Sequence, residues 1–129
     1  MAKGYLANRE RQEAIADLGK DLARRAKFTC EWCEGKGDLR PWEYSLETEP
    51  TLENLALLCG SCRELAEGKK VPGHELYVIR SALWSPISAV AIGAARVLSR
   101  CTEPWAREAI EESLIDEAVK REFLGVGWE

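Results

Sequence analysis

The chain has 129 residues, is 46% hydrophobic and carries a formal net charge of -4. This size suits one compact core, and the sequence has no run of about 18 apolar residues, which excludes a membrane span. The first residues lead directly into charged positions, without the apolar region of a signal peptide. A cytoplasmic protein is therefore expected, and there paired cysteines serve as metal ligands more often than as disulfides.

The charge is unevenly distributed along the chain. Residues 1–40 carry +2, whereas residues 41–129 carry -6. Proteins that bind nucleic acid usually have a basic excess, because phosphate contacts dominate their affinity, so this balance disfavours nucleic acid as a partner. A local basic cluster is interpreted as the solvated end of the first helix, where cations suit the helix dipole; phosphate contact is the less favoured alternative. Its members are Arg24, Arg25, Lys27, Lys36 and Arg40.

The N-terminal segment, residues 1–27, predicts an amphipathic helix over residues 6–27. Apolar residues recur there at steps of three and four with charges between them, the pattern of a surface helix with one buried face. Asn8 is the expected N-cap, since its side chain can accept a hydrogen bond from the first turn. The apolar stripe consists of Ile15, Leu18, Leu22 and Ala26.

Residues 28–70 predict a small lobe of mixed structure. Residues 39–45 are expected to form a strand, which Pro41 confines to the edge of a sheet. The apolar run at residues 55–58 leads into a cysteine pair, and a short helix-forming segment then ends at Gly68. The turn that carries the first cysteine pair, residues 29–37, is called the knuckle. A knuckle, a hairpin and a helix in this order form a treble clef, whereas a second hairpin in place of the helix would make a zinc ribbon. The helix-forming segment favours the treble clef.

Two CxxC pairs, 25 residues apart, carry the strongest chemical signal in the chain. Two cysteines three positions apart can hold one Zn²⁺ from one side, and a second pair completes a tetrahedron. We expect one structural zinc per chain, with iron as the competing metal. Four thiolate ligands leave no position for a substrate, which argues against catalysis by the metal. The expected ligands are Cys30, Cys33, Cys59 and Cys62.

Residues 71–129 predict a helical region, and its short connection to the lobe predicts that both parts pack into one compact unit. A helix is expected over residues 75–84, with Leu76, Ile79 and Leu83 inward. Ser85 is interpreted as the N-cap of the next helix, with Pro86 in its first turn. That helix has an apolar face over residues 87–101, where the small residues Ala89, Gly93 and Ala95 would admit a close neighbour.

Two further helices are expected near the C-terminus. Pro104 begins one of them, and Asp116 caps the other, which Gly125 ends. The inward-facing residues of the first are expected to be Trp105, Ala109, Ile110 and Leu114. The fold class is thus mostly α with a small α+β zinc lobe, a four-cysteine treble-clef or zinc-ribbon module packed on a helical domain.

The fifth cysteine, the single histidine and the tryptophans are further candidates for a function. Cys101 is interpreted as a small buried hydrophobe, because a nucleophile would need a base and His74 is the only histidine. His74 follows Pro72 and Gly73 and is assigned a capping or interface role, since four cysteines already complete a metal site. The five tryptophans are interpreted as core residues, because a base-stacking platform needs basic surroundings. They are Trp32, Trp42, Trp84, Trp105 and Trp128.

A further set of motifs is spread over most of the chain: residues 29–35, 38–43 and 57–62, His74, residues 83–85, 89–90 and 97–98, and residues 105–106. At these positions the chain resembles the PhnA-like family in its N-terminal zinc-binding part and the segment that follows. The family is associated by name with alkylphosphonate-uptake operons, which implies a genomic context and no particular reaction. Its members commonly continue into a small β-rich domain, whereas this chain ends at Glu129.

Residues 53–62 also resemble the segment of HNH endonucleases that leads into the second cysteine pair, with Asn54 at the middle asparagine. That chemistry needs a histidine base in the hairpin and commonly another histidine after the last cysteine. Here the hairpin, residues 40–44, has no histidine, and Arg63 follows Cys62. No imidazole is placed to activate water or to hold a catalytic ion. The resemblance therefore implies a shared scaffold without the active site.

The leading hypothesis is a non-catalytic zinc-binding protein that acts through a protein partner or by self-association. One alternative is an enzyme accessory for phosphonate or nucleic acid, in which a basic cluster would bind the anion. Another is a homodimer formed through the small-residue face around Gly93. The candidate anion-binding residues are Arg24, Arg25, Lys27, Arg40 and Arg63.

Overall fold

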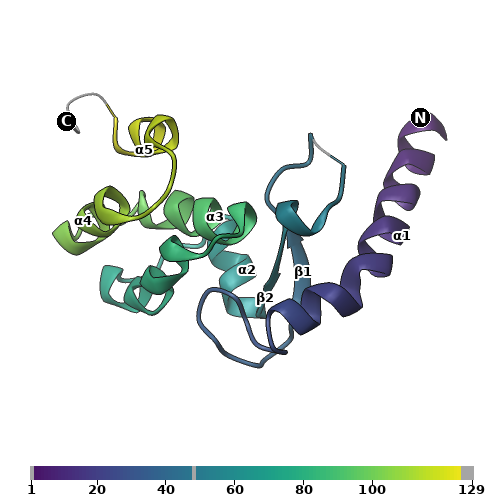
Figure 1. Ribbon diagram of the computed structural model, residues 1–129, viewed down its shortest axis with the longest axis horizontal. Helices are drawn as coiled ribbons and strands as arrows, with labels where there is room; N and C mark the ends of the chain where they lie inside the picture. Colours follow the sequence, from purple (N-terminus) through teal and green to yellow (C-terminus); the bar gives the residue numbers. More distant parts are fainter. Residues whose placement is uncertain (1, 48, 126–129) are drawn as a thin grey trace.

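A computed structural model describes residues 2–47 and 49–125 of the chain (Figure 1). The fold is mostly helical, with one small antiparallel sheet between a long N-terminal helix and a C-terminal group of helices. In chain order the elements are α1 (Ala2–Arg25), β1 (Arg40–Glu43), the 3₁₀ turn η1 (Leu52–Asn54), β2 (Leu55–Leu58), α2 (Gly60–Ala66), the 3₁₀ helix η2 (Gly73–Trp84), α3 (Ser88–Leu98), α4 (Pro104–Glu112) and α5 (Glu117–Leu124).

Helix α1 begins earlier than the sequence pattern suggests. Its first residue is Ala2, so Asn8 lies within the helix and the prediction that it is the N-cap is wrong. The residues before it include alanine, lysine and leucine, which are strong helix formers and extend the helix beyond the apolar stripe. The expected stripe does form the buried face, where Leu22 and Ala26 pack against Leu55 and Leu57.

The sheet is a hairpin of β1 and β2. Arg40 pairs with Leu58 and Glu43 with Leu55, in antiparallel register. Both strands of a two-stranded sheet are edges, which is why Pro41 is tolerated although it has no N–H to donate. All four residues of β2 are buried, since one face of the strand meets α1 and the other meets the helical region.

Helix α2 follows the hairpin directly, as the sequence predicted. It starts at Gly60, inside the second cysteine pair, and its last turn is followed by Gly68 in a left-handed conformation with φ of 110°. A positive φ at the end of a helix favours glycine, because it has no Cβ to clash with the backbone. The lobe is therefore a small α+β unit, in agreement with the expected fold class.

The segment expected as a helix over residues 75–84 is a longer 3₁₀ helix, η2. The buried positions Leu76, Ile79 and Ala82 recur every third residue, which matches the three residues per turn of a 3₁₀ helix. Leu83 is buried as well. A spacing of three is shared by α and 3₁₀ helices, so the sequence pattern identified a helix without its type.

Helix α3 is shorter at both ends than expected. Ile87 occupies the N-cap position, and the Ser85 hydroxyl accepts a hydrogen bond from the Ile87 N–H at 3.1 Å in the preceding turn. The assignment of Ser85 as N-cap is therefore wrong. The helix ends at Leu98, so half-buried Cys101 lies in the following loop rather than on the helical face.

The two C-terminal helices begin where the sequence predicted. Pro104 opens α4, and the Asp116 carboxylate caps α5 by accepting a hydrogen bond from the Ala118 N–H at 2.8 Å. Gly125, with φ of 81°, ends α5. Leu114 was expected to be inward, but 82% of its surface is exposed. Helix α4 stops at Glu112, and Leu114 lies in the turn that follows.

One hydrophobic core joins the cysteine lobe to the helical region. Three of the four CxxC cysteines and Trp32 belong to the same buried cluster as residues of η2, α3 and α4. Figure 1 shows the same arrangement, with α3 beside α2 and the hairpin, and with α4 and α5 beyond it. No helix within residues 2–47 and 49–125 is both long enough and apolar enough to cross a bilayer.

Candidate metal centre

The four CxxC cysteines come together in space. Their sulfur atoms all lie within 4.8 Å of one another, and the Sγ atoms of Cys33 and Cys59 are 3.6 Å apart. A tetrahedral zinc site with Zn–S bonds of about 2.3 Å places its sulfurs about 3.8 Å apart, so the cluster has the dimensions of a four-thiolate metal centre. All four cysteines are free thiols in the structure.

The first pair lies in the tight turn after α1. The Cys30 N–H donates to the Gly35 carbonyl at 2.7 Å, and the Glu34 N–H donates to the Cys30 carbonyl at 2.9 Å. The Gly35 N–H also points at the Cys33 sulfur, 3.4 Å away. A Cβ at Gly35 would lie only 3.3 Å from that sulfur. Glycine is needed here because the backbone approaches a ligand atom closely.

The second pair lies at the start of α2. Cys59 occupies the N-cap position and Cys62 lies in the first turn, where the helix directs both side chains toward the first pair. The Gly60 N–H donates to the Gly37 carbonyl at 3.4 Å, a backbone link between the two halves of the site. The apolar strand β2 fixes the position of Cys59, since residues 55–58 are buried immediately before it.

Burial and mutual contact govern the acidity of these thiols. Cys30, Cys59 and Cys62 are buried, whereas Cys33 is half-buried. A hydrogen bond from Cys62 lowers the pKa of Cys30 to about 4, and the same contact, with burial, raises the pKa of Cys62. Burial raises the pKa of Cys33 to about 11. The lowered pKa of Cys30 favours its thiolate, whereas the raised pKa values of Cys33 and Cys62 disfavour theirs. A divalent cation would favour ionisation of Cys33 and Cys62 by neutralising their charge.

Glu31, inside the first CxxC pair, is a structural residue that no sequence motif identifies. Its carboxylate receives two hydrogen bonds from the Arg25 guanidinium, at 2.7 and 3.0 Å, and one from the Leu57 N–H at 2.8 Å. Arg25 also donates to the carbonyls of Leu52 and Leu55. Only 19% of the Arg25 side chain and 10% of that of Glu31 are exposed. This pair ties α1, the knuckle and β2 together.

The basic residues proposed as an anion site do not converge. Arg25 is bound to Glu31, as described, while Arg63 and Arg40 both bind the Asp38 carboxylate, at 2.6 and 3.2 Å. The Arg63 hydrogen bond is the main reason why the pKa of Asp38 is lowered. Three of the five candidate anion-binding residues therefore bind carboxylates of the same chain, while Arg24 and Lys27 are exposed near the end of α1.

Two tryptophans connect the site to α3. Trp32 is almost completely buried, and its indole N–H donates to the Val90 carbonyl at 3.1 Å. Its ring meets Trp42 edge to face, with centroids 5.4 Å apart. A Cβ added to Gly93 would lie 2.8 Å from the Trp42 ring and 3.0 Å from the Trp32 ring. The small-residue face expected to receive a second copy is therefore covered by two tryptophans of the same chain.

The chain matches no family model, curated protein or solved structure. The likeness to the PhnA-like family and to HNH endonucleases thus stays a hypothesis that rests on the sequence motifs alone.

The remaining candidates lie away from the sulfur cluster. His74 is exposed at the start of η2 and does not belong to the metal-binding group. Cys101 lines a cavity between two loops. Trp32 is a core residue as predicted, while Trp84 and Trp105 are partly exposed at the edge of the core. Trp128 lies outside the described residues.

Proposed function

We propose that the chain is a non-catalytic zinc-binding protein in which four cysteines hold one structural Zn²⁺. The observation that carries this proposal is the convergence of four sulfurs within 4.8 Å, three of them from buried residues. Four thiolates fill a tetrahedral zinc ion, so no position is left for water or substrate. Such a site stabilises a fold and performs no reaction.

The order of elements around the sulfurs supports a treble clef rather than a zinc ribbon. The first pair comes from a turn, the hairpin of β1 and β2 follows, and the second pair lies at the N-terminus of α2. In a ribbon the second pair would lie on another hairpin. The PhnA-like resemblance is consistent with this arrangement, and we propose a cytoplasmic member or relative of that family with a binding or accessory role.

Asn54, the residue that resembles the middle asparagine of HNH endonucleases, holds the hairpin loop in this chain. The Asn54 side chain accepts a hydrogen bond from the Ser45 N–H at 3.0 Å and donates one to the Ser45 carbonyl at 2.8 Å. These bonds close the hairpin loop, which is a structural role for the Asn54 amide. Glu43, in the strand where a catalytic histidine would be expected, is bound to Arg11. The geometry thus favours a structural role over a nuclease.

Metal analysis of the purified protein tests the proposal. We expect about one zinc per chain, and the Cys59→Ser variant should lose it because three thiolates bind zinc far more weakly than four. Cys101→Ser is the matched control, since it removes a thiol outside the cluster. Iron alone, no metal, or one zinc retained by Cys59→Ser would each contradict the proposal.

The structural role of the metal has a separate test. Chelation should lower the protection of residues 28–66 against hydrogen exchange and proteolysis, because a lobe of this size has too small a core to fold alone. Circular dichroism and protease resistance that stay unchanged after complete metal removal would refute it. Light scattering of the same samples distinguishes self-association from a requirement for a protein partner.

A further inference from the structure

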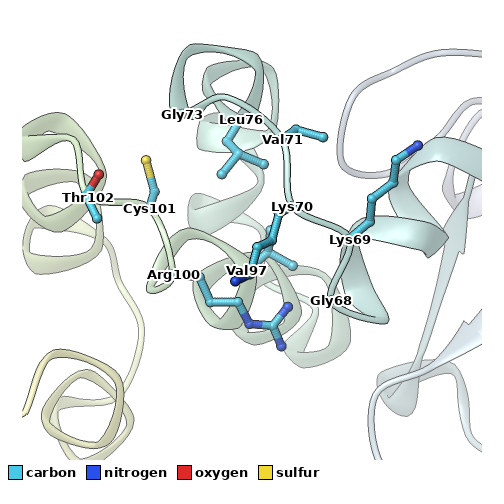
Figure 2. Close-up of a pocket in the computed structure, with 10 residues that line it drawn as sticks. All are labelled: Gly68, Lys69, Lys70, Val71, Gly73, Leu76, Val97, Arg100, Cys101 and Thr102. Atoms are coloured by element: carbon cyan, nitrogen blue, oxygen red, sulfur yellow. The ribbon is translucent and has the colours of Figure 1, made fainter.

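The cavity that Cys101 lines lies between the segment that links α2 to η2 and the loop after α3, and none of the four metal-binding cysteines lines it (Figure 2). It has a volume of about 510 Å³, which is within the range of small-molecule sites. One side is formed by residues 68–71 and Gly73, and the other by residues 100–102. The two sides are about thirty residues apart in the sequence, so only the fold brings them together.

Basic side chains line this cavity, and no acidic residue does. The cations are Lys69, Lys70 and Arg100. Figure 2 shows Lys70 and Arg100 at the same end of the cavity, whereas Lys69 points away from them. Within the described residues neither Lys70 nor Arg100 forms a salt bridge, and the one hydrogen bond of the Arg100 side chain goes to the Leu65 carbonyl at 3.3 Å. Both side chains are exposed, so their charges are accessible to an anion that enters the cavity.

The carboxylates near this cavity are engaged elsewhere. Glu64 binds Lys69 at 2.8 Å, which accounts for the cation that points away. The carboxyl carbon and the Cγ of Glu103 lie next to Gly73, and one oxygen of this carboxylate accepts a hydrogen bond from the Trp105 indole. Glu75 acts on Lys69 as well. In a chain with a net charge of -4, the charge at Lys70 and Arg100 is therefore a local exception.

The remaining walls are apolar. Val71, Leu76 and Val97 line the cavity, and Leu76 and Val97 are buried. The Thr102 side chain adds a hydroxyl that can donate to an anion. A site with two cations and one hydroxyl beside three aliphatic side chains matches a ligand with one charged and one apolar part. A nucleic acid would instead require a longer basic surface.

We propose that this cavity binds a small oxyanion that carries an apolar substituent. Lys70 and Arg100 bind the oxyanion, and Val71, Leu76 and Val97 contact the substituent. The site uses none of the metal ligands, so this proposal can be tested independently of the proposed zinc centre. Binding would connect the lobe to the helical region across the segment that joins them.

Phenyl phosphate is a suitable probe, because it combines a phosphate with an apolar ring. Titration of the metal-loaded full chain, followed by amide NMR shifts, should give saturable changes at Gly68, Gly73 and Thr102. Phenol lacks the charge and inorganic phosphate lacks the ring, so both should bind more weakly. Because each cation contributes a charge-assisted hydrogen bond, Lys70→Glu or Arg100→Glu should weaken binding of phenyl phosphate about tenfold or more.

Lys20→Glu is the matched control, because Lys20 is an exposed residue of α1 that does not line the cavity. It makes the same charge change and should leave binding unchanged. Lys70→Gln removes the charge without reversing it, and it replaces Lys70→Glu in the experiment if the reversed charge disturbs folding. The proposal is overturned if phenol binds as tightly as phenyl phosphate, if the shifts map elsewhere, or if Lys20→Glu weakens binding equally. A single-stranded oligonucleotide that binds more tightly at the same residues would also overturn it, in favour of a nucleic-acid surface.

Discussion

Replacing Gly93 with alanine should destabilise the protein, although alanine is the better helix former. The added Cβ would lie 2.8 Å from the Trp42 ring and 3.0 Å from the Trp32 ring. Trp32 cannot easily yield, because it is buried and its indole donates to the Val90 carbonyl. Overpacking of this kind costs roughly 1–3 kcal/mol, while the substitution gains roughly 0.5–1 kcal/mol of helix propensity.

Gly19→Ala is the matched control. Gly19 also lies inside a helix, but a Cβ there meets nothing within 4 Å, so only the gain in propensity should remain. The free energies of unfolding of the two variants should therefore differ by about 1–3 kcal/mol, with Gly93→Ala the less stable. Urea denaturation at fixed saturating zinc, followed by tryptophan fluorescence, measures this difference. With a slope of about 1–3 kcal/mol per M, a difference of about 2 kcal/mol separates the midpoints by roughly 1 M.

The reasoning would be refuted if Gly93→Ala proved as stable as Gly19→Ala. That result would mean that the two indole rings move aside without loss, and that the contact between the knuckle and α3 is loose. A zinc content that falls in Gly93→Ala alone would extend the argument, because Trp32 lies between two metal ligands in the sequence.

Three further predictions address the surroundings of the metal centre. Glu31→Ala should lower the free energy of unfolding by about 3 kcal/mol or more, because it leaves a partly buried guanidinium and a backbone N–H without their carboxylate. Glu13→Ala, which removes an exposed ion pair, should change it by less than about 1 kcal/mol; equal effects in urea denaturation would refute the proposed role of Glu31. The pKa of Asp38 is lowered in the folded state, so its contribution to stability is present above its ordinary pKa and is lost as the pH falls through the lowered value. Asp38→Asn should therefore flatten the acid side of a stability–pH curve, and a curve parallel to that of the wild type would count against the Arg63 contact. His74→Ala should keep its full zinc content in metal analysis, since His74 is not a member of the group of four cysteines; a stoichiometric loss would make it a ligand.

The sequence was most informative where local chemistry determines structure. The CxxC spacing identified all four residues of the cluster. Two cysteines three positions apart can face one ion through the local geometry of their turn, independently of the tertiary fold. The apolar stripe of α1 and the Asp116 cap were also predictable, since both follow from helix geometry over a few residues. Such signals depend on neighbours along the chain and need no knowledge of the tertiary fold.

Contacts between distant segments were not predictable from one sequence. The role of Glu31 depends on Arg25 and on the Leu57 N–H, which is 26 positions away, and a charged residue in a turn is usually solvated. Gly93 was correctly read as a place of close approach, but the sequence could not show that the neighbours are Trp32 and Trp42 of the same chain. The predicted ends of two helices were wrong for a related reason, since α3 and α4 each stop where the chain turns into the next packed element.

The single core that runs from the knuckle to α4 has a consequence for the protein in a cell. Because three of the four cysteines belong to the same buried cluster as Leu98 and Ile110, loss of a bound metal ion would loosen the helical region along with the lobe. Proteases recognise such opened chains, and a change of about 1–2 kcal/mol is enough to alter abundance several-fold. If the proposed zinc is the bound metal, the amount of this protein would follow the supply of zinc through its folding equilibrium.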